Sequence, residues 1–310
     1  MVKSVKIYNN FNINNNHKNS ILLIGNFDGL HLGHQKLFRL AQDFKKKYSL
    51  KIGVLTFEPM PKMFFNKSLI NFRISNQNQK ISLLKKFNVD FVVIKKFDKE
   101  FSKTKSINFI KQILSKKLKA KFIFASNNFR FGNKREGNVK QLIKYETLCK
   151  YKIIKPVPLY QNRKVISSTL IRKLLENGNL SKVNKFLNRH WSIIGKVIKG
   201  RQLGKKIGFP TANIDINDYV VAKPGVYAVR VKKQNSKKFI KGIANLGYRP
   251  TFNQKKILLE VHLFNFAENL YNKNLTVNFL KFIRKEKKFK NIGQLKKQIK
   301  IDLQIAKKIK

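Results

Sequence analysis

Short apolar runs alternate with stretches of helical periodicity between residues 21 and 187, and this alternation constrains the fold more than any other feature. We expect strands at 21–24, 52–57, 91–94, 122–125 and 153–157. Helical periodicity follows His34 and recurs around 81–87, 107–118 and 139–148. Apolar strands that are separated by helices are typical of a parallel sheet covered on both faces. The first half is therefore predicted to be an α/β, Rossmann-like domain.

Beyond residue 189 the pattern changes to strands bounded by turns, expected at 193–198, 226–231, 240–245, 258–264 and 275–282. Alternating sides along 226–231 indicate antiparallel pairing. A closing helix places Leu295, Ile299 and Leu303 on one face. We therefore predict an antiparallel β-barrel with a terminal helix, and two domains, 1–187 and 188–310.

The chain carries 68 Lys+Arg against 15 Asp+Glu, a formal charge of +53, which attracts polyanions in general. The excess is mostly Lys spread over the whole length, together with much Asn, Ile and Phe, a mixture that A/T-rich codons also produce. The single cysteine, Cys149, excludes an internal disulfide. No apolar run approaches the ~18 residues of a spanning helix, so we expect a cytoplasmic protein without a membrane partner. The Asn-rich stretch 9–19 is expected to be an exposed loop.

A glycine-rich loop with two histidines follows the first expected strand: Gly25-Asn26-Phe27-Asp28-Gly29-Leu30-His31-Leu32-Gly33-His34. His31 and His34 are three residues apart at the start of a helix, where backbone N–H groups and the helix dipole favour negative charge. Two imidazoles there can stabilise the charge that develops when the α-phosphate of ATP is attacked. The alternative is that both are ordinary surface or capping residues.

This loop resembles the His-x-Gly-His signature of the nucleotidyltransferase superfamily, which class I aminoacyl-tRNA synthetases share. Later motifs narrow the resemblance to the FMN adenylyltransferase module of bifunctional prokaryotic riboflavin kinase/FAD synthetases: Thr56-Phe57-Glu58-Pro59-Met60-Pro61, Asn128-Phe129-Arg130-Phe131-Gly132 and Ile166-Ser167-Ser168-Thr169-Leu170-Ile171-Arg172. The resemblance implies catalytic roles for His31 and His34. It implies ATP or FMN binding by Gly25, Phe27, Asp28, Gly33, Asn128, Ser168, Thr169 and Arg172. Ser126, Asn128 and Met60 depart from the usual pattern.

The segment 167–172 also has a meaning of its own, because hydroxyl groups cap helices and Arg172 offers a planar fork suited to phosphate oxygens. A plain helix cap without substrate contact is the alternative.

A second glycine-containing stretch, Gly200-Arg201-Gln202-Leu203-Gly204, leads into Gly208-Phe209-Pro210-Thr211-Ala212-Asn213. Glycines let a backbone wrap phosphates, and the Thr211 hydroxyl and Asn213 carbonyl suit Mg²⁺ that arrives with ATP. Spacing alone leaves open that this is a generic turn.

The same stretch is similar to the hallmark of riboflavin kinases, and the motifs at 224–228, 245–252 and 259–264 match as well. The resemblance, from about residue 21 to 302, implies that Glu260 is the general base, although an outward-facing strand position is the alternative. It implies ATP or flavin binding by Gly200, Gly204, Gly208, Phe209, Pro210 and Arg284, and metal binding by Thr211 and Asn213.

The expected function is Mg²⁺-dependent phosphorylation of riboflavin by ATP to FMN and ADP, followed by adenylylation of FMN to FAD and pyrophosphate. A basic RNA-binding or tRNA-acting protein is the first alternative, but the chain lacks a Lys-Met-Ser-Lys-Ser-like loop and an aromatic-basic recognition stretch. We therefore expect no specific nucleic-acid partner. The second alternative, a chain with only one of the two activities, conflicts with both motif sets being present.

Overall fold

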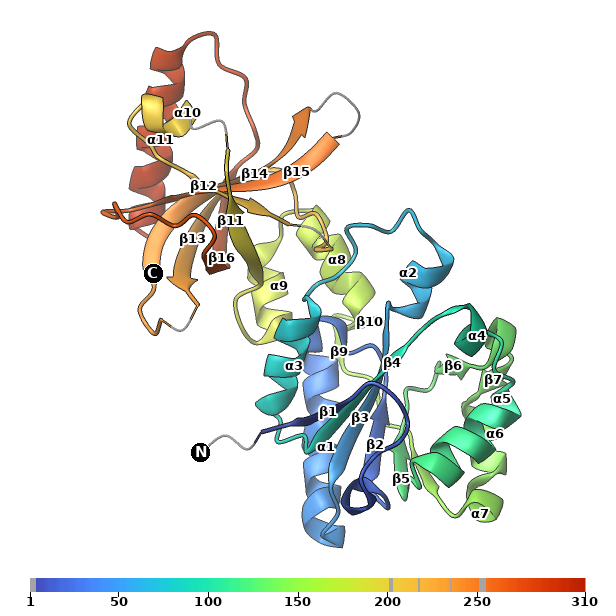
Figure 1. Ribbon diagram of the computed structural model, residues 1–310. Coiled ribbons are helices and arrows are strands. Elements are labelled where there is room, and N and C mark those ends of the chain that lie inside the picture. Colours follow the sequence, from blue (N-terminus) through green and yellow to red (C-terminus); the bar gives the residue numbers. More distant parts are fainter. Residues whose placement is uncertain (1–3, 201–202, 217, 235, 251–254, 310) are drawn as a thin grey trace. The chain divides into compact units, whose positions relative to one another are not determined.

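The computed structural model describes residues 4–200, 203–216, 218–234, 236–250 and 255–309 (Figure 1). Contacts divide the chain into two compact units. Unit 1 comprises Met1–Leu69 and Gln77–Ile166, and unit 2 comprises Ile70–Asn76 and Ser167–Lys310. Unit 2 thus includes a short segment from the first half of the sequence. A functional boundary between residues 187 and 188 stays a prediction.

Unit 1 is built on a six-stranded sheet in the order β1-β4-β3-β2-β5-β8, and every neighbouring pair is parallel. The strands are β1 (Lys6–Tyr8), β2 (Ile21–Ile24), β3 (Ile52–Glu58), β4 (Phe91–Lys96), β5 (Phe122–Phe124) and β8 (Lys152–Ile154). All five strands that the sequence predicts are present, and the parallel arrangement is confirmed. The edge strand β1 was not expected.

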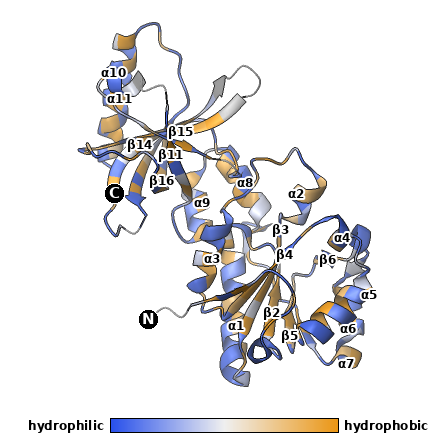
Figure 2. Ribbon diagram, viewed as in Figure 1, coloured by the Kyte–Doolittle hydropathy of each residue, from blue (hydrophilic) through white to orange (hydrophobic). Residues whose placement is uncertain are grey.

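Helices cover both faces of this sheet. Successive residues of each strand point to opposite sides, and here both sides are apolar and buried. Leu23 and Val54 belong to one core cluster, with α1 (Leu32–Tyr48) and α3 (Gln77–Lys85). Leu22 and Leu55 belong to the other, with the π-helix η3 (Phe109–Lys117) and α6 (Val139–Lys144). Figure 2 shows the strands as a predominantly hydrophobic layer.

Short elements complete unit 1: η1 (Asn15–His17), η2 (Asp28–Leu30), α2 (Pro61–Phe65), α4 (Lys99–Ser102), α5 (Ser106–Asn108), β6 (Arg130–Phe131), η4 (Asn133–Arg135), β7 (Gly137–Asn138), α7 (Glu146–Cys149), β9 (Tyr160–Gln161) and β10 (Lys164–Val165). The helical stretch expected around 139–148 is present as two short helices, α6 and α7, which meet at Tyr145.

The expectation that 9–19 is an exposed loop was only partly right. Phe11, Ile13 and His17 are buried, and His17 stacks on Phe91 and hydrogen-bonds the Tyr8 hydroxyl at 2.7 Å. These side chains pin the Asn-rich stretch to the sheet because their apolar surface is removed from water.

Unit 2 is a closed antiparallel barrel in the order β11-β12-β15-β14-β13-β16. Its strands are β11 (Ser192–Ile198), β12 (Ala212–Asp215), β13 (Gly225–Lys233), β14 (Ile240–Pro250), β15 (Lys255–Leu263) and β16 (Asn274–Arg284). Its helices are α8 (Ser168–Glu176), α9 (Leu180–Leu187), α10 (Leu203–Lys206) and α11 (Ile292–Lys307). The five expected strands and the terminal helix are confirmed. Strand β12 was missed because four residues after a Gly/Pro-rich stretch are too short to show alternation.

The barrel wall has two kinds of position. Tyr227, Leu246 and Leu259 are fully buried. The intervening residues Val226, Ala228 and Ile243 contact α11, where Ile299 and Leu303 pack against them as the sequence predicts. Among the helices in the described part of the chain, none is long and apolar enough to cross a bilayer.

Candidate functional site

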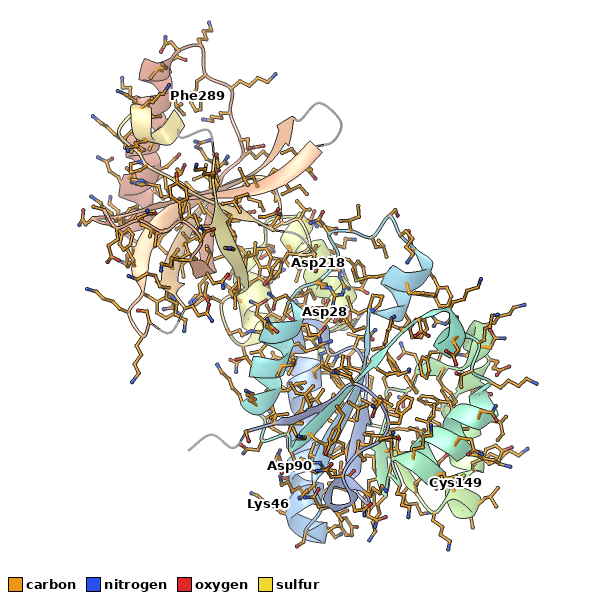
Figure 3. All side chains as sticks on the ribbon, in the orientation of Figure 1. Asp28, Lys46, Asp90, Cys149, Asp218 and Phe289 are labelled. Atoms are coloured by element: carbon orange, nitrogen blue, oxygen red, sulfur yellow. The ribbon has the colours of Figure 1, made fainter. Side chains whose placement is uncertain are left out.

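The phosphate-loop candidate of unit 1 begins where β2 ends. Phe27 adopts a left-handed conformation with φ of 49°, and its ring is buried against Phe38 and the ring of His34. A Cβ on Gly25 would lie 3.2 Å from the Phe27 ring, so a larger residue there would require that ring to shift. Phe27 thus supports the loop from within the core, and Asp28 is buried as well (Figure 3).

The structure brings the two predicted catalytic histidines together at the start of α1. His31 occupies the N-cap position, and its ring stacks on that of His34 with 3.8 Å between centroids. The pKa of His34 lies well below its ordinary value of 6.5, first because burial disfavours the charged imidazolium and second because His31 adds a like charge. Its buried Nδ1 has no hydrogen-bond partner among the described residues. Two stacked imidazoles at a helix N-terminus suit an anionic ligand.

Two further predicted residues lie at the same carboxyl edge of the sheet. Gly33 packs so closely that a Cβ there would lie 3.2 Å from the His31 ring and 3.2 Å from the carbonyl oxygen of Ile166. Asn128 is exposed in the loop after β5, where its Oδ1 accepts a hydrogen bond from the Ser126 hydroxyl at 2.9 Å. β5 and β3 flank β2 on opposite sides, so β2 marks the switch point where ligands bind in open α/β sheets.

Sequence reasoning missed Lys80 of α3, whose side chain is buried beside the loop that follows β2. Its Nζ lies 3.4 Å from the Asn26 carbonyl oxygen and 3.3 Å from Oγ1 of Thr56. A buried lysine is unusual. No local signal distinguishes it in a chain that is rich in lysine, and only the packing of α3 identifies it.

The predicted Ser/Thr/Arg segment forms the start of α8 in unit 2, whereas His31 and His34 belong to unit 1. Ser167 caps the helix, because its hydroxyl accepts a hydrogen bond from the Leu170 amide at 3.2 Å. Ser168 and Thr169 occupy the first two helical positions. Arg172 follows in the second turn, where its guanidinium lies 3.7 Å from the Phe72 ring centroid.

A cavity of about 350 Å³ lies between the barrel wall and α11. It brings together six of the predicted kinase residues: Gly204, Phe209, Thr211, Asn213, Glu260 and Arg284. Ile207, Val226, Ile243, Asn245, His262, Glu286, Lys287, Phe289, Leu295, Ile299 and Asp302 complete the lining. Phe289, labelled in Figure 3, belongs to the stretch that precedes α11.

The other three predicted residues lie beside this lining. A Cβ on Gly200 would collide with the side-chain amide of Asn213. Gly208 has a φ of 88°, which favours glycine. The Pro210 carbonyl oxygen accepts a hydrogen bond from Nδ1 of His262 at 2.8 Å, which fastens the loop to β15.

Strand register explains why distant residues meet in this cavity. Glu260 pairs with Asn213 on one side and with Asn245 on the other, and Asn245 pairs with Val226. Val226 in turn pairs with Arg284. Directly paired residues point to the same face of a sheet. One row across five strands therefore sets a carboxylate, two amides and a guanidinium along a single wall.

Asn213 fits a metal-ligand role because its Oδ1 is buried and has no hydrogen-bond partner within the described residues. A buried carbonyl without a partner costs free energy unless a ligand satisfies it, and Mg²⁺ prefers oxygen. Thr211 lines the same cavity two residues earlier.

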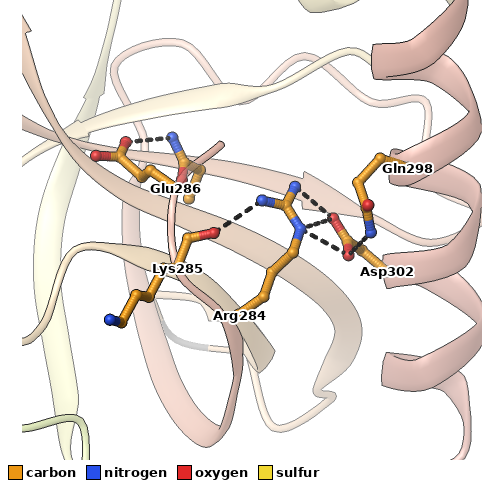
Figure 4. Close-up of polar contacts among 6 residues, drawn as sticks. Arg284, Lys285, Glu286, Gln298 and Asp302 are labelled. Atoms are coloured by element: carbon orange, nitrogen blue, oxygen red, sulfur yellow. Dashed lines mark hydrogen bonds and ion pairs between the residues drawn. The ribbon is translucent and has the colours of Figure 1, made fainter. Parts of the chain in front are cut away.

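Arg284 is held by Asp302 of α11 in a bidentate ion pair (Figure 4). Asp302 is 1% exposed and also accepts from Gln298 at 3.0 Å. Sequence reasoning gave no role to Asn245 or Asp302. Asp302 had one detectable signal, since it is a carboxylate in a lysine-rich amphipathic helix, whereas Asn245 becomes significant only through its register with Glu260.

Comparisons with known proteins agree on both units. A family model described as FAD synthetase matches residues 13–170, and one described as riboflavin kinase matches residues 187–310. A bifunctional riboflavin kinase/FMN adenylyltransferase of Buchnera aphidicola subsp. Schizaphis graminum is 40% identical over 300 residues, which is 96% of each chain. The protein of that name from Escherichia coli K12 is 37% identical, covering 90% of this chain and 89% of its own. A crystal structure titled macrolide-efflux protein, from Streptococcus pneumoniae, superposes with a TM-score of 0.87 at 28% identity and 99% coverage of both chains.

Proposed function

The chain belongs to the bifunctional riboflavin kinase/FMN adenylyltransferase family, and from this we propose which of its residues carry out each of the two ATP-dependent reactions. Riboflavin is phosphorylated to FMN, and FMN is adenylylated to FAD. We assign the first reaction to the cavity of unit 2 and the second to the histidine loop of unit 1.

In the kinase reaction, Glu260 is the general base. Its carboxylate accepts the proton of the riboflavin 5′-hydroxyl while that oxygen attacks the γ-phosphorus of ATP and ADP leaves. The row Asn213–Glu260–Asn245 is the observation that carries this assignment, because it sets the base directly beside the proposed metal ligand. Glycines 200, 204 and 208 give the backbone room to approach the phosphates, with Phe209 and Pro210 completing that loop.

Thr211 and Asn213 would hold Mg²⁺ in company with the ATP phosphates. The ion, when bound, offsets charge on the transferring phosphoryl group. Asp302 and the Lys285 carbonyl oxygen accept from only some of the five N–H donors of Arg284, and we assign this residue to the flavin-side substrate.

In the adenylyl transfer, an FMN phosphate oxygen attacks the α-phosphorus of ATP and pyrophosphate leaves. His31 and His34 stabilise the negative charge that accumulates there, aided by the N-terminus of α1. Gly25, Gly33, Phe27 and Asp28 shape this loop, and Asn128 contributes from the neighbouring strand end. Ser168, Thr169 and Arg172 bind phosphate oxygens at the start of α8.

Two sets of variants test these assignments. Glu260→Gln retains shape but cannot accept the proton, so riboflavin phosphorylation should fall by ~10²–10⁴-fold. The same variant supplied with FMN should make FAD at the normal rate. The double variant His31→Ala with His34→Ala should lose FAD formation while it still phosphorylates riboflavin to FMN. Parallel time courses that resolve FMN and FAD by chromatography measure both. Equal loss of both activities in either folded variant would overturn the two-site division.

We propose a cytoplasmic location and assign no specific nucleic-acid or membrane partner to the +53 charge. Any RNA retained by the protein should be released steeply as salt rises, because such binding depends on counterion release. Selective retention of one RNA at physiological salt would contradict this.

A further inference from the structure

The segment Ile70–Asn76 reaches unit 2 from the first half of the chain and is fixed there by its backbone. The amides of Phe72 and Arg73 donate to the Asp218 carbonyl oxygen at 3.0 and 2.7 Å. The Val220 amide donates to the Arg73 carbonyl oxygen at 2.7 Å, and the indole N–H of Trp191 donates to that of Ile74 at 3.0 Å. Asp218, labelled in Figure 3, thereby holds the peptide group between Phe72 and Arg73, which carries the Phe72 carbonyl oxygen.

Phe72 makes two different contacts with Arg172 of α8. Nε of Arg172 donates to the Phe72 carbonyl oxygen at 2.7 Å. The guanidinium carbon lies 3.7 Å from the centroid of the Phe72 ring. A hydrogen bond in the guanidinium plane and an aromatic ring at its face together restrict both the position and the tilt of the group.

The contact with the Phe72 carbonyl engages one of the five N–H donors of the guanidinium, the one on Nε. An arginine side chain has large rotamer freedom, and fixing it before the ligand arrives lowers the entropic cost of binding.

We propose that Phe72 is a positioning residue for adenylyl transfer, which holds Arg172 in the orientation that binds the nucleotide phosphates. This inference rests on the proposed role of Arg172. Phe72, which belongs to unit 2, would then contribute to adenylyl transfer rather than to riboflavin phosphorylation.

The test compares Phe72→Ala, Phe72→Tyr, Arg172→Ala and the double variant in the full-length chain, with both activities measured. Phe72→Ala should raise the KM for ATP in FAD formation about tenfold, with riboflavin phosphorylation and the unfolding midpoint of unit 2 unchanged. Phe72→Tyr keeps the aromatic face and should restore the wild-type KM. In the double variant, loss of Phe72 should add nothing to the effect of Arg172→Ala. Ile70→Ala, at an exposed position of the same segment, is the matched control and should leave both activities unchanged.

A purely structural role predicts a different result, because Phe72 packs within unit 2. Riboflavin phosphorylation or the unit 2 midpoint would then fall together with FAD formation, and this outcome would overturn the proposal. Additive effects in the double variant would overturn it as well. If Arg172→Ala retains normal FAD formation, the role proposed for Arg172 fails. If Arg172→Ala loses activity while Phe72→Ala does not, only the positioning role fails.

Discussion

Arg284 and Asp302 join the last barrel strand to the terminal helix through three hydrogen bonds of 2.8 to 3.0 Å. The Asp302 side chain is 1% exposed and that of Arg284 is 16% exposed, so the pair is largely removed from water. It fastens α11 beside the cavity and sets the guanidinium at its wall. The pair therefore links the stability of unit 2 to the wall of the cavity that we propose binds the substrate.

Asp302→Ala should lower the free energy of unfolding of unit 2 by about 3–5 kcal/mol, because it leaves a buried guanidinium without its counter-charge. Urea unfolding followed by fluorescence of Trp191, the single tryptophan of the chain, measures this. The KM for riboflavin should rise, while FAD formation from FMN persists. Glu268→Ala breaks the exposed pair with Lys233 and is the control without measurable effect. An Asp302→Ala variant as stable as wild type would refute the importance of this pair.

Asn213→Ala should change the Mg²⁺ requirement of riboflavin phosphorylation without lowering the stability of the free protein. Removing a buried carbonyl group that lacks a partner should leave the stability of the free protein unchanged or slightly higher. The Mg²⁺ concentration needed for half-maximal riboflavin phosphorylation should rise by at least about tenfold, because losing even a group that only orients a metal ligand typically costs about that much. A titration of activity with Mg²⁺ and a thermal melt without ligand measure the two effects. Asn274→Ala, on the exposed side of β16, is the control. An unchanged Mg²⁺ requirement would remove Asn213 from the metal site.

The pKa of His34 should be measurable by NMR, since the chain has five histidines. We expect its ring signals to titrate well below pH 6.5, and His31→Gln should raise this pKa because it removes a neighbouring positive charge. Pyrophosphate should raise it as well, because an anion favours the imidazolium. A His34 pKa at or above 6.5 in the free protein would contradict the burial described here.

The same shift has a consequence for stability. A depressed pKa in the folded state means that the contribution of His34 is complete above about pH 6.5 and is lost as pH falls toward the folded pKa. The slope for one group is at most about 1.4 kcal/mol per pH unit. His34→Gln should therefore lose less stability between pH 6.5 and 5.5 than wild type, as urea unfolding of unit 1 by circular dichroism would show. Equal losses of stability in the variant and in wild type would show that the pKa of His34 is not lowered in the folded state.

A fragment of residues 188–310 should be less stable than the barrel in the full chain. It lacks Ile70–Asn76, whose Ile74 carbonyl accepts the indole N–H of Trp191, and it lacks the helices α8 and α9. Trp191 is 1% exposed in the full chain, so its emission in the fragment should shift to longer wavelength. Restoring residues 167–187 should recover part of the shift. Identical emission from fragment and full chain would show that the added segments are dispensable.

Much of this protein follows from local sequence. The apolar runs and helical periods predict the parallel sheet and its helices, and glycines mark loops whose backbones must turn or approach a ligand. His31 and His34 follow from spacing at a helix start. Glu260 stands out as a carboxylate in an apolar strand. Each of these signals lies within a few residues along the chain, where hydrophobic period and turn chemistry act.

The tertiary structure alone decided which distant residues meet. Pairing of β15 with β12 and β14 gave Glu260 its neighbours Asn213 and Asn245, and the packing of α11 gave Arg284 its partner Asp302. The attachment of Ile70–Asn76 to unit 2 placed Phe72 against an arginine 100 residues away. Such contacts depend on strand register and on the burial of surfaces from separate elements. No local pattern encodes them, because they form only when the whole core packs.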